Sequence, residues 1–93
     1  MDRKDSTRLR LTNEELDLHR LTVDEAIPKL DKFIHDAYRS GLQQVWIVHG
    51  KGTGTLRRAV RHHLSGHPLV AFCATADRFH GGTGVTQVRL SDW

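Results

Sequence analysis

The feature that most constrains the fold is a run of four apolar residues, 45–48, that leads directly into a turn with glycine at alternate positions. Such a run is typical of a strand that is covered on both faces or central in its sheet. The turn, His49-Gly50-Lys51-Gly52-Thr53-Gly54, precedes a helical pattern of apolar residues that a glycine and a proline end after residue 65. A strand, a tight turn and a helix in this order indicate an α/β domain.

Three further strands and a second helix are expected around this unit. Residues 16–19 alternate apolar and polar side chains, as in a half-buried strand, and this puts Asp17 and His19 together on the face away from the core. Thr22 and Glu25 form a capping box that begins a helix, and Gly41 ends it. Pro28 lies beyond the first turn of that helix and is expected to kink or loosen it.

The last two strands are expected at residues 69–75 and 85–90, where they can pair as a hairpin. The element order is therefore βαβαββ. Strand–helix–strand units favour parallel pairing with right-handed crossovers. The prediction is a two-layer α/β sandwich, of the α+β type, on a four-stranded mixed sheet.

Size and composition limit the chain to one domain. We assign residues 1–15 to a flexible leader or the stub of a linker from a longer protein, and residues 16–93 to the domain. The single cysteine, Cys73, excludes an intramolecular disulfide and fits a reducing compartment. The apolar runs are only a few residues long and the first fifteen residues are polar, so neither a membrane span nor a signal peptide is expected. These features predict a cytoplasmic protein.

The positive charge of the chain lies in its second half. Residues 1–48 carry a net charge of −1 and residues 49–93 a net charge of +4. Charge of this kind is most often a solvated face, so its placement has to decide what it binds. Here it accompanies the glycine-rich turn.

The glycine-rich turn has the features of an anion site. Alternate glycines let backbone N–H groups approach a ligand, and the helix N-terminus that follows adds unpaired N–H groups and a partial positive charge. The alternative is an ordinary strand-to-helix turn. The mononucleotide and dinucleotide patterns both fail on glycine spacing, so an extended polyanion is favoured. The contacts expected for its backbone come from Gly50, Lys51, Gly52, Thr53, Gly54, Arg57, Arg58 and Arg61.

A second set of residues suggests chemistry on that polyanion. Asp17 and His19 leave the first strand, and His49 ends the second, which is expected to be parallel and adjacent. A carboxylate and two imidazoles beside a phosphate cradle, with Lys51 to stabilise developing charge, could hydrolyse a phosphodiester. Asp17 could also hold a divalent metal such as magnesium or manganese. The alternative is that Asp17 caps the next turn and His19 is a surface residue.

Two weaker patterns remain. His62, His63 and His67 suggest zinc, but no second cysteine or His-Glu-x-x-His accompanies them, and this interpretation is disfavoured. Gly81-Gly82-Thr83-Gly84 is either a hairpin turn or a second loop that contacts the backbone through Gly81, Gly82 and Gly84. We expect this loop and the end of the first strand to lie beside the glycine-rich turn.

Three motifs in this order resemble the Smr (small MutS-related) domain, over about residues 16–90. They are Leu16-Asp17-Leu18-His19 with residues 21–26, His49 to Gly54 with Leu56 and Arg57, and Gly81 to Thr86 with Val88 and Leu90. The resemblance implies a fold similar to the C-terminal domain of translation initiation factor three. It also implies nucleic-acid binding and endonuclease activity on DNA or RNA. Asp17 and His19 match the family's usual catalytic candidates.

The resemblance also implies possible settings for the domain: the C-terminus of a larger MutS-related chain, DNA repair or recombination, or ribosome quality control. One residue departs from the family, which commonly has glycine where this chain has Arg20. If that position needs a positive φ, Arg20 carries strain, although it could also add a phosphate contact. The leading hypothesis is a nucleic-acid-binding nicking endonuclease. The alternatives are a non-catalytic module that places a larger protein on branched DNA or ribosomes, and a purely protein-binding adaptor.

Overall fold

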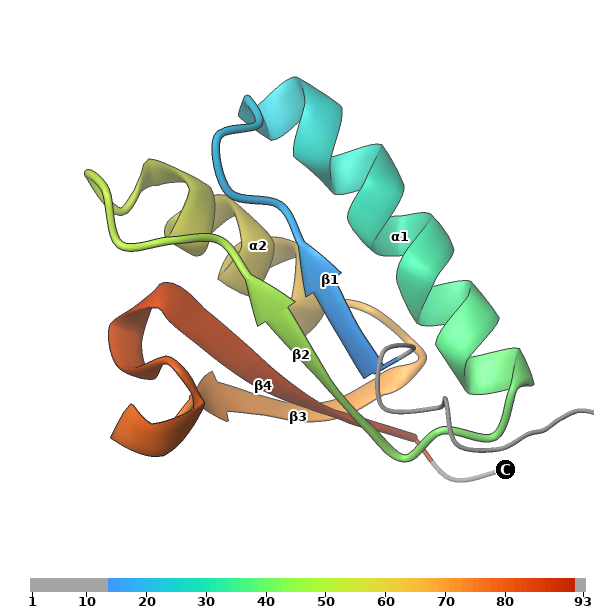
Figure 1. The fold of residues 1–93 in the computed structure, drawn as a ribbon. Helices are drawn as coiled ribbons and strands as arrows, with labels where there is room; N and C mark the ends of the chain where they lie inside the picture. Colours follow the sequence, from blue (N-terminus) through green and yellow to red (C-terminus); the bar gives the residue numbers. More distant parts are fainter. Residues whose placement is uncertain (1–13, 92–93) are drawn as a thin grey trace, which may run out of the picture.

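The computed structural model describes residues 14–91, which form one sheet and one layer of helices (Figure 1). The elements are β1 (Glu15–Asp17), α1 (Val23–Arg39), β2 (Gln44–Val48), α2 (Thr55–Ser65), β3 (Val70–Thr75) and β4 (Val85–Leu90), with short 3-10 helices η2 (Arg78–His80) and η3 (Gly82–Gly84) before β4. The expected order is confirmed. Residues 1–13 of the expected leader lie outside the described part.

The sheet is mixed, with strand order β1-β2-β4-β3. β1 and β2 are parallel, and β4 is antiparallel to both of its neighbours, β2 and β3. The four-stranded mixed sheet, the parallel first pair and the terminal hairpin are therefore confirmed. β3 does not pair with β2, because β4 occupies the place between them.

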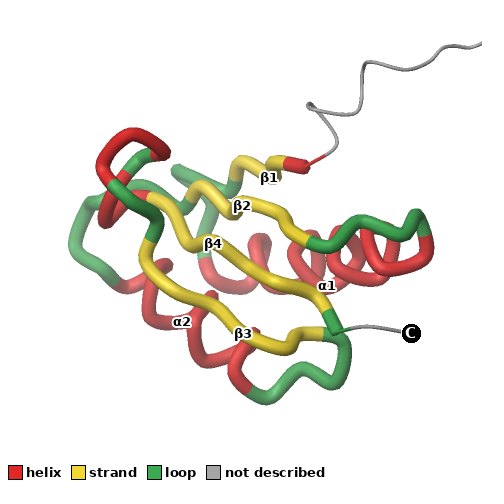
Figure 2. The backbone as a smooth tube through the Cα atoms, turned by 90° about the horizontal axis from the view of Figure 1, so that it is seen from below, coloured by secondary structure: helices red, strands yellow, loops and turns green. Residues whose placement is uncertain are grey.

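Both helices cover the same face of the sheet, as the view from below shows (Figure 2). The apolar run of β2 is central in the sheet but covered on one face only: Val45 and Ile47 are fully buried, whereas Trp46 and Val48 are partly exposed. The side chains that fill the layer between helices and sheet are Leu18, Ala26, Leu30, Ile34, Ala37, Val45, Ile47, Val60, Leu64, Val88 and Leu90.

Local signals fix the bounds of α1. Thr22 accepts a hydrogen bond from the backbone N–H of Glu25, and Glu25 returns one to the backbone N–H of Thr22, so the capping box is confirmed. The helix runs on through Pro28, and Gly41 follows it with φ +80°. Neither helix in residues 14–91 is long and apolar enough to cross a membrane.

Candidate functional site

Three segments meet at one end of the sheet: the end of β1, the 49–54 turn and the 81–84 loop. The backbone N–H of Leu18 donates to Val48 O at 2.7 Å, which ties the end of β1 to the end of β2. The carbonyl of Gly84 accepts from the N–H groups of His49 and Gly50, at 3.1 and 3.0 Å. A Cβ on Gly50 would lie 3.4 Å from the Cβ of His19. The structure therefore places the three predicted segments side by side.

The turn uses glycine where backbone geometry requires it. Gly50, Gly52 and Gly54 have φ of +81°, +28° and +87°, in the region that L residues rarely adopt. Gly54 is the N-cap of α2 and gives its N–H groups no side-chain cap. The hydroxyls of Thr53 and Thr55 bond each other at 3.0 Å beside it.

The two helix N-termini at this end differ in what they offer an anion. The first turn of α1 carries its own carboxylates, Asp24 and Glu25, and its N-cap is satisfied. The first turn of α2 has no acidic residue. The positive end of the α2 dipole is therefore the one left for an external negative charge.

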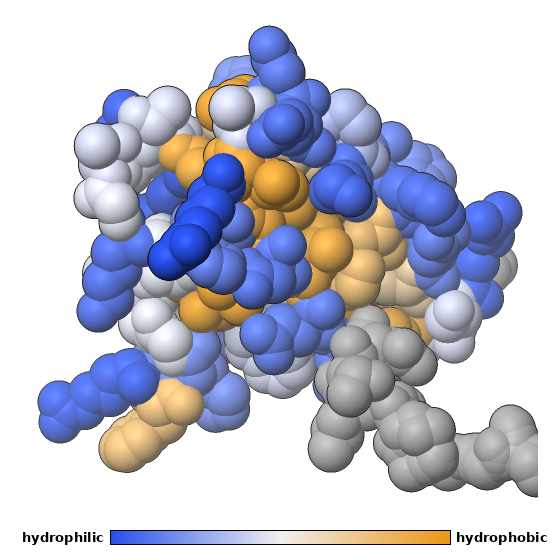
Figure 3. All heavy atoms as spheres, turned by 45° about the horizontal axis from the view of Figure 1, so that its top comes forward, coloured by the Kyte–Doolittle hydropathy of each residue, from blue (hydrophilic) through white to orange (hydrophobic). Residues whose placement is uncertain are grey.

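A pocket of about 480 Å³ lies between these two helix starts. Its cationic lining comes from Arg20, Lys51 and Arg57, and the whole 49–54 turn contributes to its wall. Lys51 is exposed. Figure 3 shows the molecule with its helical side tilted toward the viewer. On this face, hydrophilic side chains (blue) surround an apolar area (orange).

The three arginines of α2, all expected to contact the polyanion, differ in their surroundings. Arg57 and Arg61 are half-buried and both donate to the hydroxyl of Thr75, at 3.1 and 3.3 Å. Arg58 is exposed, and its Nη1 would lie 3.2 Å from a Cβ on Gly54. The bonds to Thr75 hold two of the guanidinium groups against the end of β3, while the third extends beside the turn.

Asp17 and His19 form a pair at the end of β1. One carboxylate oxygen of Asp17, Oδ1, accepts from the backbone N–H of His19 at 3.0 Å and from its Nδ1 at 2.5 Å. These bonds, the side-chain bond first, hold the pKa of Asp17 below its ordinary value. Because the carboxylate accepts, Nδ1 carries a proton, and Nε2 is left as the ring nitrogen for exchange. Both side chains are about half exposed, 54% for Asp17 and 48% for His19.

His49 has a different environment, because only 4% of it is exposed. Its Nδ1 bonds the carbonyl of Gly50 and its Nε2 the hydroxyl of Thr86, both at 2.9 Å. A carbonyl can only accept, so Nδ1 carries the proton and Nε2 accepts from Thr86. Burial lowers the pKa of His49, and the charges of Arg57 and Arg61 act in the same direction. The neutral ring thus joins the turn to β4.

Arg20 has φ +72° and is the one non-glycine residue with positive φ in residues 14–91. The condition posed from the sequence is therefore met, since the backbone at this position is left-handed. The turn that it makes is closed by a bond from Leu21 N to Leu18 O at 3.1 Å. Arg20 therefore accepts backbone strain at the wall of the pocket.

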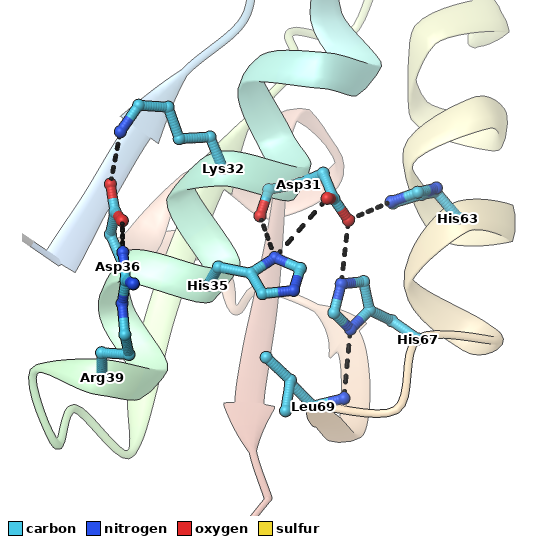
Figure 4. Close-up of polar contacts among 8 residues, drawn as sticks. All are labelled: Asp31, Lys32, His35, Asp36, Arg39, His63, His67 and Leu69. Carbon is cyan, nitrogen blue, oxygen red and sulfur yellow. Dashed lines mark hydrogen bonds and ion pairs between the residues drawn. The ribbon is translucent and has the colours of Figure 1, made fainter.

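Two of the histidines that weakly suggested zinc, His63 and His67, meet Asp31 between α1 and the end of α2 (Figure 4). The sequence did not indicate Asp31. Its Oδ1 lies 3.2 Å from His63 Nε2 and 3.0 Å from His67 Nε2. The three ligand-type atoms are within 4.8 Å of one another, a spacing that could hold a metal ion. Asp31 is separated from the histidines by more than thirty residues, so no local spacing signals the group.

The hydrogen bonds of His67 explain this cluster without a metal. Its Nδ1 accepts from the backbone N–H of Leu69 at 3.1 Å, so in the neutral ring Nε2 carries the proton and donates to Asp31. A metal on Nε2 would require that proton to move to Nδ1 and would break the Leu69 bond. We therefore treat the cluster as a clamp between α1 and the end of α2.

Comparisons with known proteins agree with the motifs. The sequence model of the Smr domain matches residues 16–91. Endonuclease MutS2 of Pelotomaculum thermopropionicum is 47% identical over 77 residues, and that of Caldicellulosiruptor saccharolyticus is 49% identical over 77 residues. In both cases the match covers 83% of this chain and 10% of the relative, so the chain spans about a tenth of the length of these proteins.

Two solved structures share the fold. The Smr domain of Thermus thermophilus MutS2 superposes with a TM-score of 0.83 at 42% identity, covering 85% of this chain and 99% of that one. YdaL, a stand-alone small MutS-related protein from Escherichia coli, gives a TM-score of 0.82 at 32% identity, covering 86% of this chain and 66% of that one.

Proposed function

We propose that this chain, which belongs to the Smr domain family, binds the sugar–phosphate backbone of nucleic acids and hydrolyses phosphodiester bonds. The observation that carries the proposal is the start of α2, where the N-cap Gly54 offers no side-chain cap and the Thr55 N–H has only a long bond, 3.4 Å, to Thr53 Oγ1. Three glycines with positive φ lead into it, and it opens into a pocket that Lys51 and Arg20 line. The relatives named as MutS2 endonucleases support the same activity.

Binding rests on contacts that ignore base sequence. A phosphate in the pocket takes hydrogen bonds from the N–H groups at the start of α2, and Lys51 and Arg58 neutralise its neighbours along the strand. Contacts of this kind position a nucleic acid without reading its sequence. DNA and RNA both present the required backbone, and the experiments below separate them.

Hydrolysis is assigned to the Asp17–His19 pair. Neither side chain lines the pocket, but His19 lies beside Gly50 of its wall. Asp17 orients the imidazole through Nδ1, and Nε2 takes a proton from the attacking water. The water oxygen bonds to phosphorus, the bond to one ester oxygen breaks, and the departing alkoxide takes a proton from solvent. Lys51 stabilises the negative charge that develops on the non-bridging oxygens. A magnesium or manganese ion at Asp17 is a further proposal.

In this scheme His49 does not touch the substrate; it holds the glycine-rich turn in place. Both of its ring nitrogens are occupied and the ring is buried. It is a positioning residue that fixes Gly50 relative to β4.

The test is a nuclease assay on matched DNA and RNA substrates, with and without magnesium or manganese. Asp17→Ala and His19→Ala are expected to lose cleavage and keep affinity for the nucleic acid, whereas Lys51→Ala weakens both. Matched controls are His62→Ala and Lys29→Ala, which change exposed residues outside the site. Cleavage that survives in Asp17→Ala at the wild-type rate would contradict the role given to the pair.

A non-catalytic function is the second candidate. The chain spans about a tenth of the length of its MutS2 relatives, and Asp17 also stabilises the turn after β1 through its bond to the His19 N–H. A module that places a larger MutS-related chain on branched DNA, or a protein on the ribosome, would bind with the same residues and cleave nothing. Binding without cleavage on every substrate and metal tested would establish this alternative.

A further inference from the structure

The segment from Asp77 to Gly84, which precedes β4, is a loop whose conformation is fixed by internal hydrogen bonds and a close steric contact. Asp77 accepts from the backbone N–H of Phe79 at 2.9 Å through its carboxylate, and from the N–H groups of His80 and Gly82 at 3.0 and 2.9 Å through its carbonyl. Its carboxylate also bonds His80 Nδ1 at 2.8 Å. Gly81 has φ +110°, and a Cβ there would lie 2.2 Å from Val85 Cγ2. The conformation is thus held by several independent constraints.

The loop exposes the ring of Phe79 to solvent and packs the ring of His80 against the sheet. His80 stacks on Trp46 of β2, with ring centroids 5.6 Å apart and an interplanar angle of 15°. Phe79 is 88% exposed, the more exposed of the two large apolar side chains that stand out in the described chain. The guanidinium of Arg78 lies 5.9 Å from the centroid of the Phe79 ring. The Phe79 ring is therefore largely exposed to solvent, with the Arg78 cation over it.

The loop is continuous with the phosphate site. Its last residue, Gly84, accepts the N–H groups of His49 and Gly50, and a Cβ on Gly84 would lie 3.3 Å from Lys51 Cγ. Figure 1 shows η2 and the 49–54 turn at the same end of the sheet, with the helices on the other side of the sheet from η2. A strand held at the turn would have to pass around this end of the sheet to meet Phe79.

We propose that Phe79 stacks an unpaired nucleobase of the bound nucleic acid, so that this surface selects substrates with single-stranded or flipped-out nucleotides next to the anchored phosphate. The inference rests on the proposed function and names its substrate class. An aromatic ring stacks on any base because each base has a π-face. In a duplex the neighbouring base pairs cover those faces, and even the last pair leaves only one face open. An unpaired base exposes both faces and can leave the stack.

The surroundings of Phe79 favour a base over an apolar protein partner. The guanidinium of Arg78, which lies over the Phe79 ring, suits the phosphates that accompany a base. An apolar protein partner would instead require a wider patch of exposed apolar side chains. Because the loop is already ordered, it loses less conformational entropy when a ligand binds.

The experiment compares Phe79→Ala with Phe72→Ala, a matched control on edge strand β3 whose ring is 58% exposed. Affinity is measured by fluorescence anisotropy for a fully paired duplex and for the same duplex with a single-stranded overhang, in DNA and RNA forms. Phe79→Ala is expected to lose about tenfold in affinity for the overhang substrate, with little change on the blunt duplex. Phe72→Ala is expected to leave both affinities unchanged.

A second measurement locates the base directly. An oligonucleotide with 5-iodouracil in the overhang is irradiated in complex with the 93-residue chain, and the cross-linked peptide is identified by mass spectrometry. Cross-linking to Phe79 is expected, and its disappearance in Phe79→Ala with the Phe72→Ala signal intact supports the assignment.

The outcomes separate the two proposals. Equal losses on paired and overhang substrates, or no loss on either, overturn the stacking role of Phe79. If Lys51→Ala still weakens binding in that case, the proposed function stands without the stacking site. Wild-type chain that binds no nucleic acid at all overturns both.

Discussion

At the scale of the residue, Arg20 carries a conformational cost that its own side chain does not relieve. A left-handed φ costs an L residue about 1–2 kcal/mol, and the value here is +72°. Glycine would remove this strain but would add flexibility to the unfolded chain, which costs roughly 0.4–1 kcal/mol. A residue that keeps such strain at a pocket wall is a candidate for ligand binding.

We therefore predict that Arg20→Gly raises the free energy of unfolding by about 0.5–1 kcal/mol and weakens nucleic-acid binding. Chemical denaturation and anisotropy measure the two effects. Arg20→Ala is the control, because it removes the charge and keeps the strain: it should lose affinity without gaining stability. A loss of stability in Arg20→Gly would contradict this account of the backbone.

At the scale of the element, the Asp31 clamp fixes the end of α2 against α1. His67 is almost completely buried, with 5% of its side chain exposed, so its Nε2–H depends on Asp31 for an acceptor. An unsatisfied buried donor costs about 1–3 kcal/mol. The ion pairs of Asp36 with Lys32 and Arg39 lie on the same helix but in solvent, where water screens the charges and such pairs contribute little to stability.

Asp31→Ala is predicted to lower the free energy of unfolding by about 1–2 kcal/mol, and the control Asp36→Ala by less.

The bond from His63, more than that from His67, lowers the pKa of Asp31 in the folded state. A lowered folded pKa means stability that is present above the unfolded pKa and is lost as the pH falls through the folded value. The difference between wild type and Asp31→Ala should therefore shrink below about pH 4. A difference that is constant with pH would exclude the carboxylate as its source.

Local sequence predicted the elements better than their side-chain contacts. The capping box, the glycine-rich turn and the left-handed residue 20 depend on neighbours in the chain, and each was found where expected. The bonds of Arg57 and Arg61 to Thr75 were not predicted, because Thr75 lies on β3, far from both arginines in the chain. The same reason hid the burial of His49 against Thr86 and the approach of Asp31 to His63 and His67.

At the scale of the whole molecule, the basic charge gathers where the two helix starts and the ends of β1 and β2 meet. We predict that Arg57→Ala combined with Arg58→Ala reduces the slope of log affinity against log salt by about 1–2, because each phosphate contact contributes about 0.9 on duplex DNA. Titrations at several salt concentrations measure the slope. The control is Lys32→Ala with Arg39→Ala, which removes two exposed charges elsewhere on α1. An unchanged slope in the Arg57/Arg58 variant would exclude this surface from the interface.

The sequence by itself determined the element order, the caps, the turn and the family of the domain. Each of these depends on residues close together in the chain or on short contiguous sequence motifs. Tertiary structure alone decided that β4 enters between β2 and β3, that Gly84 closes on the turn, and that His49 is buried while the Asp17–His19 pair stays accessible. These outcomes depend on contacts between residues far apart in the chain, and such contacts exist only once the sheet has formed and its two helices have covered one face.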